Sequence, residues 1–342
     1  MKIIILTDYK NHFETKYSAV PYRSGFDKKA LKSYFSDFKI EIEFKAFSEI
    51  DFENNEIKNQ YFLYTSSEDK HVFYKGYIED VVYGIHLAGG KLLPGYKYLK
   101  AHHNKVFMEV LRSQSKLDSI KNIKSKLYGT YEDFIKDKFT IQNSIVVKPA
   151  EGSMSKGISL HSTLNSAKKA IKNISKSQLV FQDLKDYFRR FKHQGYITNS
   201  KHRKKFITQN YVENLKGDWK ILIYGNRYYV LNRENRKNDF RASGGGHLSY
   251  NKEVPNLLLD FSKDIFNELD VPNLSLDIGL SDGELYLIEF QALFFGTYTL
   301  EYSEYYFRKE ELSWQIVEEN SILEKVYVES IHSYISKRNK GK

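Results

Sequence analysis

Residues 146–158 read VVKPAEGSMSKGI, an apolar run that ends in Lys148 and passes into a loop with two glycines. A lysine at the end of a buried strand costs free energy unless an anion lies beside it. Glycines and small polar residues let the N–H groups of a loop approach phosphate oxygens. Gly152 and Gly157 have the spacing of a P-loop, but Ile158 stands where a P-loop needs lysine, which excludes that motif. The stretch therefore indicates an anion-binding loop after a strand, or else an ordinary hairpin with a surface lysine.

Two carboxylates and an amide interrupt two apolar strands that a turn at residues 282–283 joins. Glu289 and Gln291 are two residues apart, so they point to the same face of their strand. The turn folds Asp277 of the preceding strand back beside them. Carboxylate and amide oxygens are ligands that suit Mg²⁺. The alternative is a set of strand-end residues exposed at a sheet edge.

Two further segments place polar groups after a strand. The triple glycine at 244–246 follows three arginines, which are Arg233, Arg236 and Arg241. Guanidinium groups suit the recognition of phosphate or carboxylate, although a solvated basic loop has the same composition. The strand expected at 206–212 leads into Glu213. Such a strand would present backbone groups to an adenine and a carboxylate to ribose hydroxyls, or it is simply a core strand.

The composition is that of a globular protein. The chain has 342 residues, of which 41% are hydrophobic and 28% charged, and its net charge of +10 suggests an anionic partner. The absence of cysteine excludes disulfides, thiolate nucleophiles and cysteine-based zinc or iron–sulfur sites, and it agrees with a cytoplasmic location. No run reaches the roughly 18 apolar residues of a membrane span, so we expect no membrane partner. The familiar nucleic-acid motifs are also missing, so we do not expect nucleic acid as the partner.

Apolar patterns predict a small α/β part at residues 1–100, in which strands and helices alternate and form a parallel sheet. Residues 101–140 are expected to be mainly helical. The predicted strands are 2–7, 40–44, 61–65, 144–148, 158–161, 206–212, 219–224, 227–231, 275–280 and 285–290. The predicted helices are 27–38, 75–87, 166–174, 256–269 and a long amphipathic one at 311–335.

The order of these elements, from about residue 103 to residue 300, resembles the ATP-grasp superfamily. The resemblance is closest to its amide-forming ligases, such as glutathione synthetase and the enzymes that add glutamate to a ribosomal protein. It implies an α/β protein with α+β lobes. The expected parts are an N-terminal α/β domain at 1–100, a lid lobe at 101–213 and a C-terminal lobe with the metal site at 214–342.

The resemblance also implies roles for individual residues. Lys105 and Lys148 look like the two lysines that contact the phosphates of ATP, and residues 151–157 look like the mobile loop over them. Arg241 resembles the arginine that faces an acyl phosphate. Gln291 and Ser243 stand where the family usually has asparagine. The candidate ATP ligands are Lys105, Lys148, Glu151, Gly152, Ser153, Gly157, Gln209, Tyr211, Val212, Glu213 and Arg233; the candidate catalytic residues are Arg241 and Lys148; the candidate Mg²⁺ ligands are Asp277, Glu289 and Gln291.

The implied reaction is that of an ATP-dependent C–N ligase. A small-molecule or peptide carboxylate takes the γ-phosphoryl group of ATP, and an amine then attacks the acyl phosphate to form an amide or peptide bond. The cofactors are ATP and Mg²⁺. One alternative is a kinase on the same scaffold, which phosphorylates a hydroxyl group. Another is a polyanion-binding protein in which the ATP site is vestigial.

The stretch Lys185–Lys205 contains eight Lys or Arg residues. We expect its interleaved aromatic residues, which are Tyr187, Phe188, Phe191 and Tyr196, to anchor the stretch to the body of the lid with the charges outward. Such a patch would attract an acidic substrate or a polymer that carries carboxylates. The alternative is a solvated surface insertion without a ligand.

Overall fold

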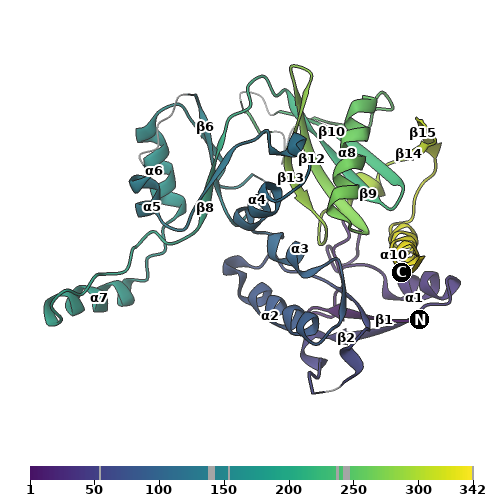
Figure 1. Cartoon of the computed structure of the whole chain (residues 1–342), viewed down its shortest axis with the longest axis horizontal. Helices are drawn as coiled ribbons and strands as arrows, with labels where there is room; N and C mark the ends of the chain where they lie inside the picture. The colour runs from purple at the N-terminus through teal and green to yellow at the C-terminus, as the bar shows by residue number, and fades with distance from the viewer. Residues whose placement is uncertain (54, 138–142, 153–154, 236–238, 242–246, 341–342) are drawn as a thin grey trace. The chain divides into compact units, whose positions relative to one another are not determined.

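The computed structural model describes residues 1–342 except 54, 138–142, 153–154, 236–238, 242–246 and 341–342 (Figure 1). The chain forms two compact units. Unit 1 consists of residues 1–102, 115–120 and 214–342, and unit 2 consists of residues 103–114 and 121–213. Each unit has its own sheets, and the division of the chain into three domains remains a prediction.

The first sheet of unit 1 is parallel, as the alternation of strands and helices predicts. Its strand order is β2-β1-β3-β4, with β1 at Lys2–Thr7, β2 at Glu41–Ala46, β3 at Tyr61–Tyr64 and β4 at Lys91–Leu93. Helix α1 (Lys28–Asp37) is capped by Asp27, whose side chain accepts hydrogen bonds from the N–H groups of Lys29 and Ala30. Helices α2 (Phe73–Leu87) and α3 (Tyr96–Ala101) follow β3 and β4. Short 3₁₀ turns lie at Phe47–Glu49, Asn55–Ile57, Lys70–Val72 and Asp118–Lys121.

The second sheet of unit 1 is antiparallel and has the order β13-β12-β9-β10-β14-β15, with β11 paired to β10. The strands are β9 (Gly217–Tyr224), β10 (Arg227–Glu234), β11 (Leu248–Ser249), β12 (Asn273–Ser281), β13 (Glu284–Gln291), β14 (Tyr305–Glu310) and β15 (Ser313–Glu318). Helices α8 (Asn256–Leu269) and α9 (Tyr298–Glu301) belong to the same part of the chain.

The long helix predicted at 311–335 is wrong. Residues 313–318 form β15, which pairs with β14 so that Ser313 lies opposite Glu310. Helix α10 begins only at Leu323 and ends at Lys340. The residues between β14 and β15 form a tight turn in which Glu311 has a φ of 47°. The edge of β14 offers strand pairing, which outweighs the helical spacing of the same apolar residues.

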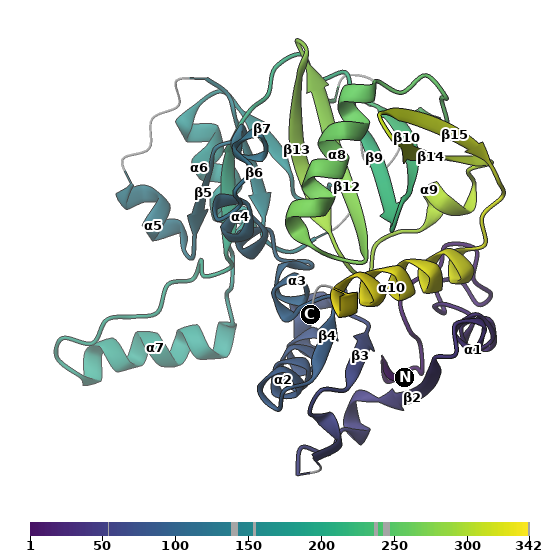
Figure 2. The ribbon, with the colours of Figure 1, turned by 45° about the vertical axis from the view of Figure 1, so that its right-hand side comes forward.

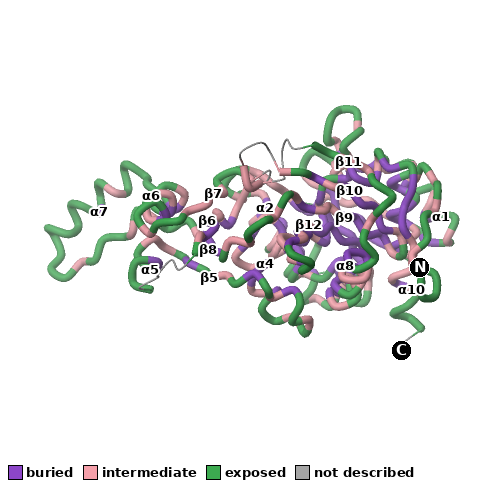
Figure 3. The backbone as a smooth tube through the Cα atoms, turned by 90° about the horizontal axis from the view of Figure 1, so that it is seen from above, coloured by how far each residue is buried: buried purple, intermediate pink, exposed green. Residues whose placement is uncertain are grey.

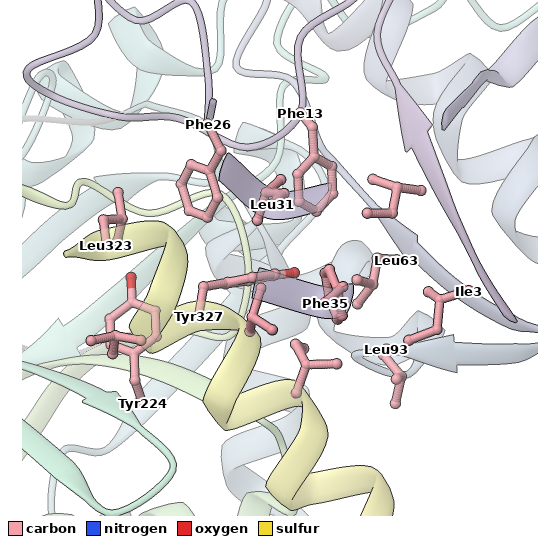
Figure 4. Packing of buried hydrophobic residues seen from close by; sticks show 14 of the residues in the cluster. Ile3, Phe13, Phe26, Leu31, Phe35, Leu63, Leu93, Tyr224, Leu323 and Tyr327 are labelled. Atoms are coloured by element: carbon pink, nitrogen blue, oxygen red, sulfur yellow. The ribbon is translucent and has the colours of Figure 1, made fainter. Parts of the chain in front are cut away.

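The core of unit 1 joins its two sheets. The ring of Tyr327 on α10 meets the rings of Phe13 and Phe26 edge-on, with centroids 5.9 and 5.1 Å apart (Figure 4). Residues of β1, α1, β9 and α10 share one buried cluster, which includes Ile3, Ile5, Leu31, Phe35, Leu222, Tyr224, Val328 and Ile331. Burial of this apolar surface holds the parallel sheet against the antiparallel one.

Unit 2 is built on an antiparallel sheet of order β5-β8-β6-β7 (Figure 2). Its strands are β5 (Ser125–Tyr128), β6 (Ile145–Pro149), β7 (Ser159–His161) and β8 (Phe206–Asn210), and its helices are α4 (Lys105–Ser113), α5 (Tyr131–Lys136), α6 (Leu164–Ile174) and α7 (Val180–Lys192). Ile145, Val147, Phe206 and Ile171 contribute to a small core on one face of this sheet. The prediction that 101–140 is mainly helical therefore misses β5, which forms because β8 supplies an edge to pair with.

Burial differs strongly along unit 2 (Figure 3). The sheet strands contain buried residues, whereas α7 is exposed along most of its length. Across the described part of the chain, no helix combines the length and apolarity needed to cross a bilayer.

Candidate active site

One face of the antiparallel sheet in unit 1 gathers the predicted metal ligands. Asp277 on β12 lies directly opposite Glu289 on β13, and Ser275 lies opposite Gln291. On its other side, Asp277 lies opposite Lys220 on β9. Residues two apart on a strand share a face, so these five side chains lie on the same side of the sheet. The structure thus brings together Asp277, Glu289 and Gln291.

Asp277 is held by two cations. One Asp277 oxygen lies 2.8 Å from Nη2 of Arg233, and the other accepts a hydrogen bond of 3.3 Å from Nζ of Lys220. Lys220 also donates to Oγ of Ser275 at 3.0 Å, and Nε of Arg233 donates to Asp218 at 2.5 Å. Burial alone would raise the pKa of Asp277, but the charges of Arg233 and Lys220 outweigh it and lower that pKa. Burial raises the pKa of Asp218, and the charge of Arg233 offsets this rise only in part.

Arg233 therefore stands between two acidic groups. The sequence suggests it as a ligand of ATP, whereas in the structure its guanidinium is buried and binds Asp218 and Asp277. A buried carboxylate pair of this kind needs such a cation, since like charges in a low dielectric repel. The role that the contacts of Arg233 support is to position Asp277.

The donor set of this face suits Mg²⁺. Gln291 donates its amide N–H to Oε1 of Glu289 at 3.1 Å, so the two side chains lie together. Among the residues that the structure describes, Glu289 has no cationic partner. The same described residues contain no group of three His, Cys, Asp or Glu side chains that could hold a metal ion. Two carboxylates and an amide oxygen leave further coordination positions to phosphate oxygens and water, as Mg²⁺ sites in proteins usually do.

Arg241 follows β10 and pairs with Asp239. Its Nε donates to both carboxylate oxygens, at 2.9 and 3.0 Å, and its Nη2 donates to Oδ2 at 2.6 Å. The bidentate geometry fixes the plane of a half-buried guanidinium. Arg236, Ser243 and the triple glycine at 244–246, which the sequence also singles out, lie outside the described residues.

In unit 2, the start of α4 is bound to the loop after β6. Nζ of Lys105 donates to the carbonyl oxygen of Gly152 at 2.9 Å, and the N–H of Lys105 donates to that of Ala150, also at 2.9 Å. Gly157 has a φ of 76°, and a Cβ there would lie 3.0 Å from Cγ of Pro149, so the turn requires glycine. The structure thus brings Lys105 to the predicted phosphate loop, in which Glu151 is half-buried; Ser153 lies outside the described residues.

A buried polar network lies where α4 packs on the sheet of unit 2. Nε2 of Gln209 donates to Glu109 at 3.1 Å and to Oγ of Ser125 at 2.9 Å, and Ser125 donates to the other oxygen of Glu109 at 2.7 Å. Nη2 of Arg112 lies 3.3 Å from Glu109. The side chain of Gln209, a residue that the sequence names as a candidate ATP ligand, is therefore engaged inside unit 2.

Sequence reasoning misses three members of this network, Glu109, Arg112 and Ser125, although the spacing of the two on α4 carries a signal. Lys105, Glu109 and Arg112 are four and three residues apart, which puts them on one face of α4, and all three are buried. Lys148 lies opposite Ile207 and two positions from Val146, which is opposite Gln209, so Lys148 and Gln209 share a face of the sheet. Lys105, Lys148 and Gln209 are thus brought to the same side of unit 2.

The remaining predicted ATP ligands follow β8. The N–H of Tyr211 donates to the carbonyl oxygen of Ser144 at 3.1 Å, which continues the pairing of β8 with β6 by one residue. Tyr211 and Val212 are half-buried, and Glu213 is exposed. These residues lead from β8 into a turn at the end of unit 2.

The predicted anchoring of the basic stretch is wrong for three of its four aromatic residues. Tyr187, Phe188 and Phe191 are 55%, 62% and 72% exposed. Tyr196 is half-buried, but its hydroxyl group donates to Asp186 of the same stretch, at 2.6 Å, and not to the body of the lid. The reason is that no residue of α7 belongs to the described small core of unit 2, so that core does not cover these rings.

No family model and no curated protein matches the chain. Solved structures do match. The D-cycloserine synthetase DcsG has 10% identity and a TM-score of 0.55, with 97% of this chain and 99% of that chain covered. D-alanyl-alanine synthetase A from Vibrio cholerae has 12% identity and a TM-score of 0.50, with 98% and 99% covered. The ATP-grasp ligase PsnB, complexed with its minimal precursor, has 10% identity and a TM-score of 0.50, with 97% and 99% covered. At these identities the likeness establishes the fold alone, which is the fold that the chain shares with the ATP-grasp ligase PsnB.

Proposed function

We propose that the chain is an ATP- and Mg²⁺-dependent ligase that joins a carboxylate to an amine through an acyl phosphate. The observation that carries the proposal is the cross-strand pair of Asp277 and Glu289, with Gln291 beside it, in a chain with the ATP-grasp fold. The structural neighbours are, by their names, synthetases and ligases.

The proposal assigns the nucleotide to residues of unit 2. Nζ of Lys105 binds a neutral carbonyl oxygen, so this contact leaves its positive charge available to a phosphate group. Lys148 extends from the same face of the sheet, and the loop at 151–157 supplies backbone N–H groups. The segment Tyr211–Glu213 supplies backbone groups for adenine and a carboxylate for ribose.

The proposal assigns the metal to residues of unit 1. Asp277, Glu289 and Gln291 would hold Mg²⁺, which supplies positive charge that compensates the phosphate oxygens. Arg233 and Lys220 hold the Asp277 carboxylate in place and keep it ionised. Arg241, oriented by Asp239, would bind the oxygens of the transferred phosphoryl group.

The substrates are a small-molecule or peptide carboxylate and an amine. An acidic substrate would be attracted by the cations of Lys185–Lys205. A variant with Arg189→Ser, Arg190→Ser, Lys204→Ser and Lys205→Ser tests this attraction. Its KM for the carboxylate should rise and become less sensitive to salt, while its KM for ATP stays unchanged. Unchanged kinetics for both substrates would contradict this role.

A screen of product formation tests the ligase proposal. The chain is incubated with Mg²⁺-ATP and pooled carboxylates, with and without pooled amines and amino acids, and ADP, phosphate and new masses are measured. A ligase releases ADP and free phosphate and forms an amide only when both pools are present. A stable phosphorylated product would identify a kinase instead. ATP that neither binds nor turns over would contradict both enzymes and favour a polyanion-binding protein.

A further inference from the structure

Helix α7 carries an apolar stripe that stays exposed among the described residues of its unit. The stripe consists of side chains that are 53% to 83% exposed, and its members are Val180, Phe181, Leu184, Tyr187, Phe188 and Phe191. Spacings of three, four and seven residues place these side chains along one face of the helix. Six large apolar side chains in one exposed line form a patch of the kind that marks an interaction surface.

The face of α7 opposite the stripe contacts the segment that follows the helix. Asp186 is buried and accepts hydrogen bonds from the hydroxyl group of Tyr196, from the N–H and the amide group of Asn199, and from Arg189. These contacts bind the helix to residues 196–199, which follow it in the chain. The N–H of Ser177, which precedes the helix, donates to the carbonyl oxygen of Lys201 at 2.9 Å. The apolar stripe therefore points away from the contacts that fix the helix.

The charges around the stripe specify an anionic partner. Residues 178–205 contain eight Lys or Arg and two Asp. Lys185 and Lys192 border the stripe on one side, and Asp183 and Arg190 border it on the other, as the helical spacing places them. Two copies of this chain would bring these cations against each other, so charge opposes a stripe-to-stripe dimer.

The shape of the surface favours a lipid bilayer over an acidic protein. The stripe belongs to a single helix that projects from its sheet, so it is convex (Figures 1 and 2). A protein partner needs a matching groove, whereas a bilayer surface covers a convex apolar face without one. A helix with an apolar aromatic face flanked by lysine and arginine is the type that lies in the headgroup region of a membrane.

We propose that α7 is a membrane-surface helix, whose apolar stripe inserts into the headgroup boundary of a bilayer with anionic lipids. The cations beside the stripe then contact the lipid headgroups. The helix does not cross the bilayer, so the prediction that the chain has no membrane span is unaffected, while the expectation of no membrane partner is replaced. The inference does not depend on the proposed ligase activity.

Co-sedimentation of the full chain with vesicles tests the inference. Binding to vesicles of phosphatidylcholine with phosphatidylglycerol should be strong, should weaken with salt, and should exceed binding to phosphatidylcholine alone by about tenfold or more. The variant Phe181→Ser, Phe188→Ser, Phe191→Ser should bind at least about tenfold more weakly. A matched variant at exposed apolar positions elsewhere, Phe73→Ser, Leu257→Ser, Leu312→Ser, should bind like the unmodified chain.

A second measurement reports insertion directly. The indole of a Phe188→Trp variant should be quenched by lipids with brominated acyl chains, and that of Leu312→Trp should not. Absence of vesicle binding, equal loss in both triple variants, or absence of quenching at position 188 would overturn the inference. Binding to poly-glutamate that requires the three phenylalanines, without vesicle binding, would identify an acidic polypeptide as the partner and would also overturn it. Self-association of the chain that is lost when the three phenylalanines are replaced would identify a second copy as the partner. This result would also overturn the inference.

Discussion

Arg233 and Asp277 form an ion pair of 2.8 Å on the polar face of the antiparallel sheet, and Asp277 lies opposite Glu289 on the next strand. The two acidic residues therefore differ in their surroundings. Asp277 is compensated by Arg233 and Lys220, whereas Glu289 contacts the amide of Gln291. Loss of the Asp277 charge should therefore destabilise the protein more than loss of the Glu289 charge, although both residues are proposed metal ligands.

Glu289→Gln and Asp277→Asn should both abolish turnover, because each removes a proposed metal-ligand charge while it keeps the side-chain volume. Their stabilities should differ. Asp277→Asn leaves Arg233 and Lys220 without a full counter-charge and should lower the free energy of unfolding by about 1–3 kcal/mol. Glu289→Gln should change it by less than about 0.5 kcal/mol. Urea denaturation and ADP release measure the two effects. Near-normal activity of either variant would rule out that residue as a metal ligand.

Mg²⁺-ATP should raise the melting temperature of the chain, since a ligand that binds only the native state stabilises it. EDTA should remove most of this shift. Lys148→Ala should reduce the shift without a change in the melting temperature of the free protein, because Lys148 is only half-buried. Lys172→Ala, at an exposed position of α6, is the matched control. An ATP-induced shift that persists in EDTA would count against the acidic set as the metal site.

Gln209→Ala should destabilise the chain by about 1–2 kcal/mol, because Glu109 and Ser125 each lose a buried hydrogen bond. Gln178→Ala, on the surface of the same unit, should have an effect below about 0.5 kcal/mol. The measurement is denaturant unfolding followed by circular dichroism. Equal stability of the two variants would show that the network of Glu109 contributes nothing measurable.

Stability should fall as pH rises from 4.5 to 8, because of Glu14. Burial raises the pKa of Glu14 to about 8, despite a hydrogen bond from the N–H of Phe294 to its carboxylate at 2.7 Å. The native state therefore keeps a proton that the unfolded state has already released. The contribution of Glu14 is complete below the unfolded pKa of 4.5 and is lost as pH approaches 8, at about 1.4 kcal/mol per pH unit.

The variant Glu14→Gln should remove this slope, since glutamine does not titrate. The exposed Glu253→Gln serves as the control and should retain it. Urea denaturation at pH 5, 6, 7 and 8 measures the slope in each protein. A slope that persists in Glu14→Gln would show that other groups carry the pH dependence.

Local patterns in the chain predict a large part of this protein. Strand β1 and helix α8 have the predicted bounds, and the turn at residues 282–283 places Asp277 beside Glu289 as expected. These features depend on the periodicity of a strand or helix and on the geometry of a turn, which act over a few residues. The alternation of such segments predicts the parallel sheet, whereas the ATP-grasp fold is expected from the resemblance to that superfamily.

Contacts between distant segments decide the rest. Gln209 and Glu109 are 100 residues apart, and Arg233 reaches Asp277 only because β10 and β12 flank β9 in the same sheet. The same holds for residues 313–318, which are a strand because β14 offers an edge, and for the phenylalanines of α7, which stay exposed because their helix leaves the core of its unit. Burial and strand pairing depend on which surfaces meet in three dimensions, and spacing along the chain does not contain that information.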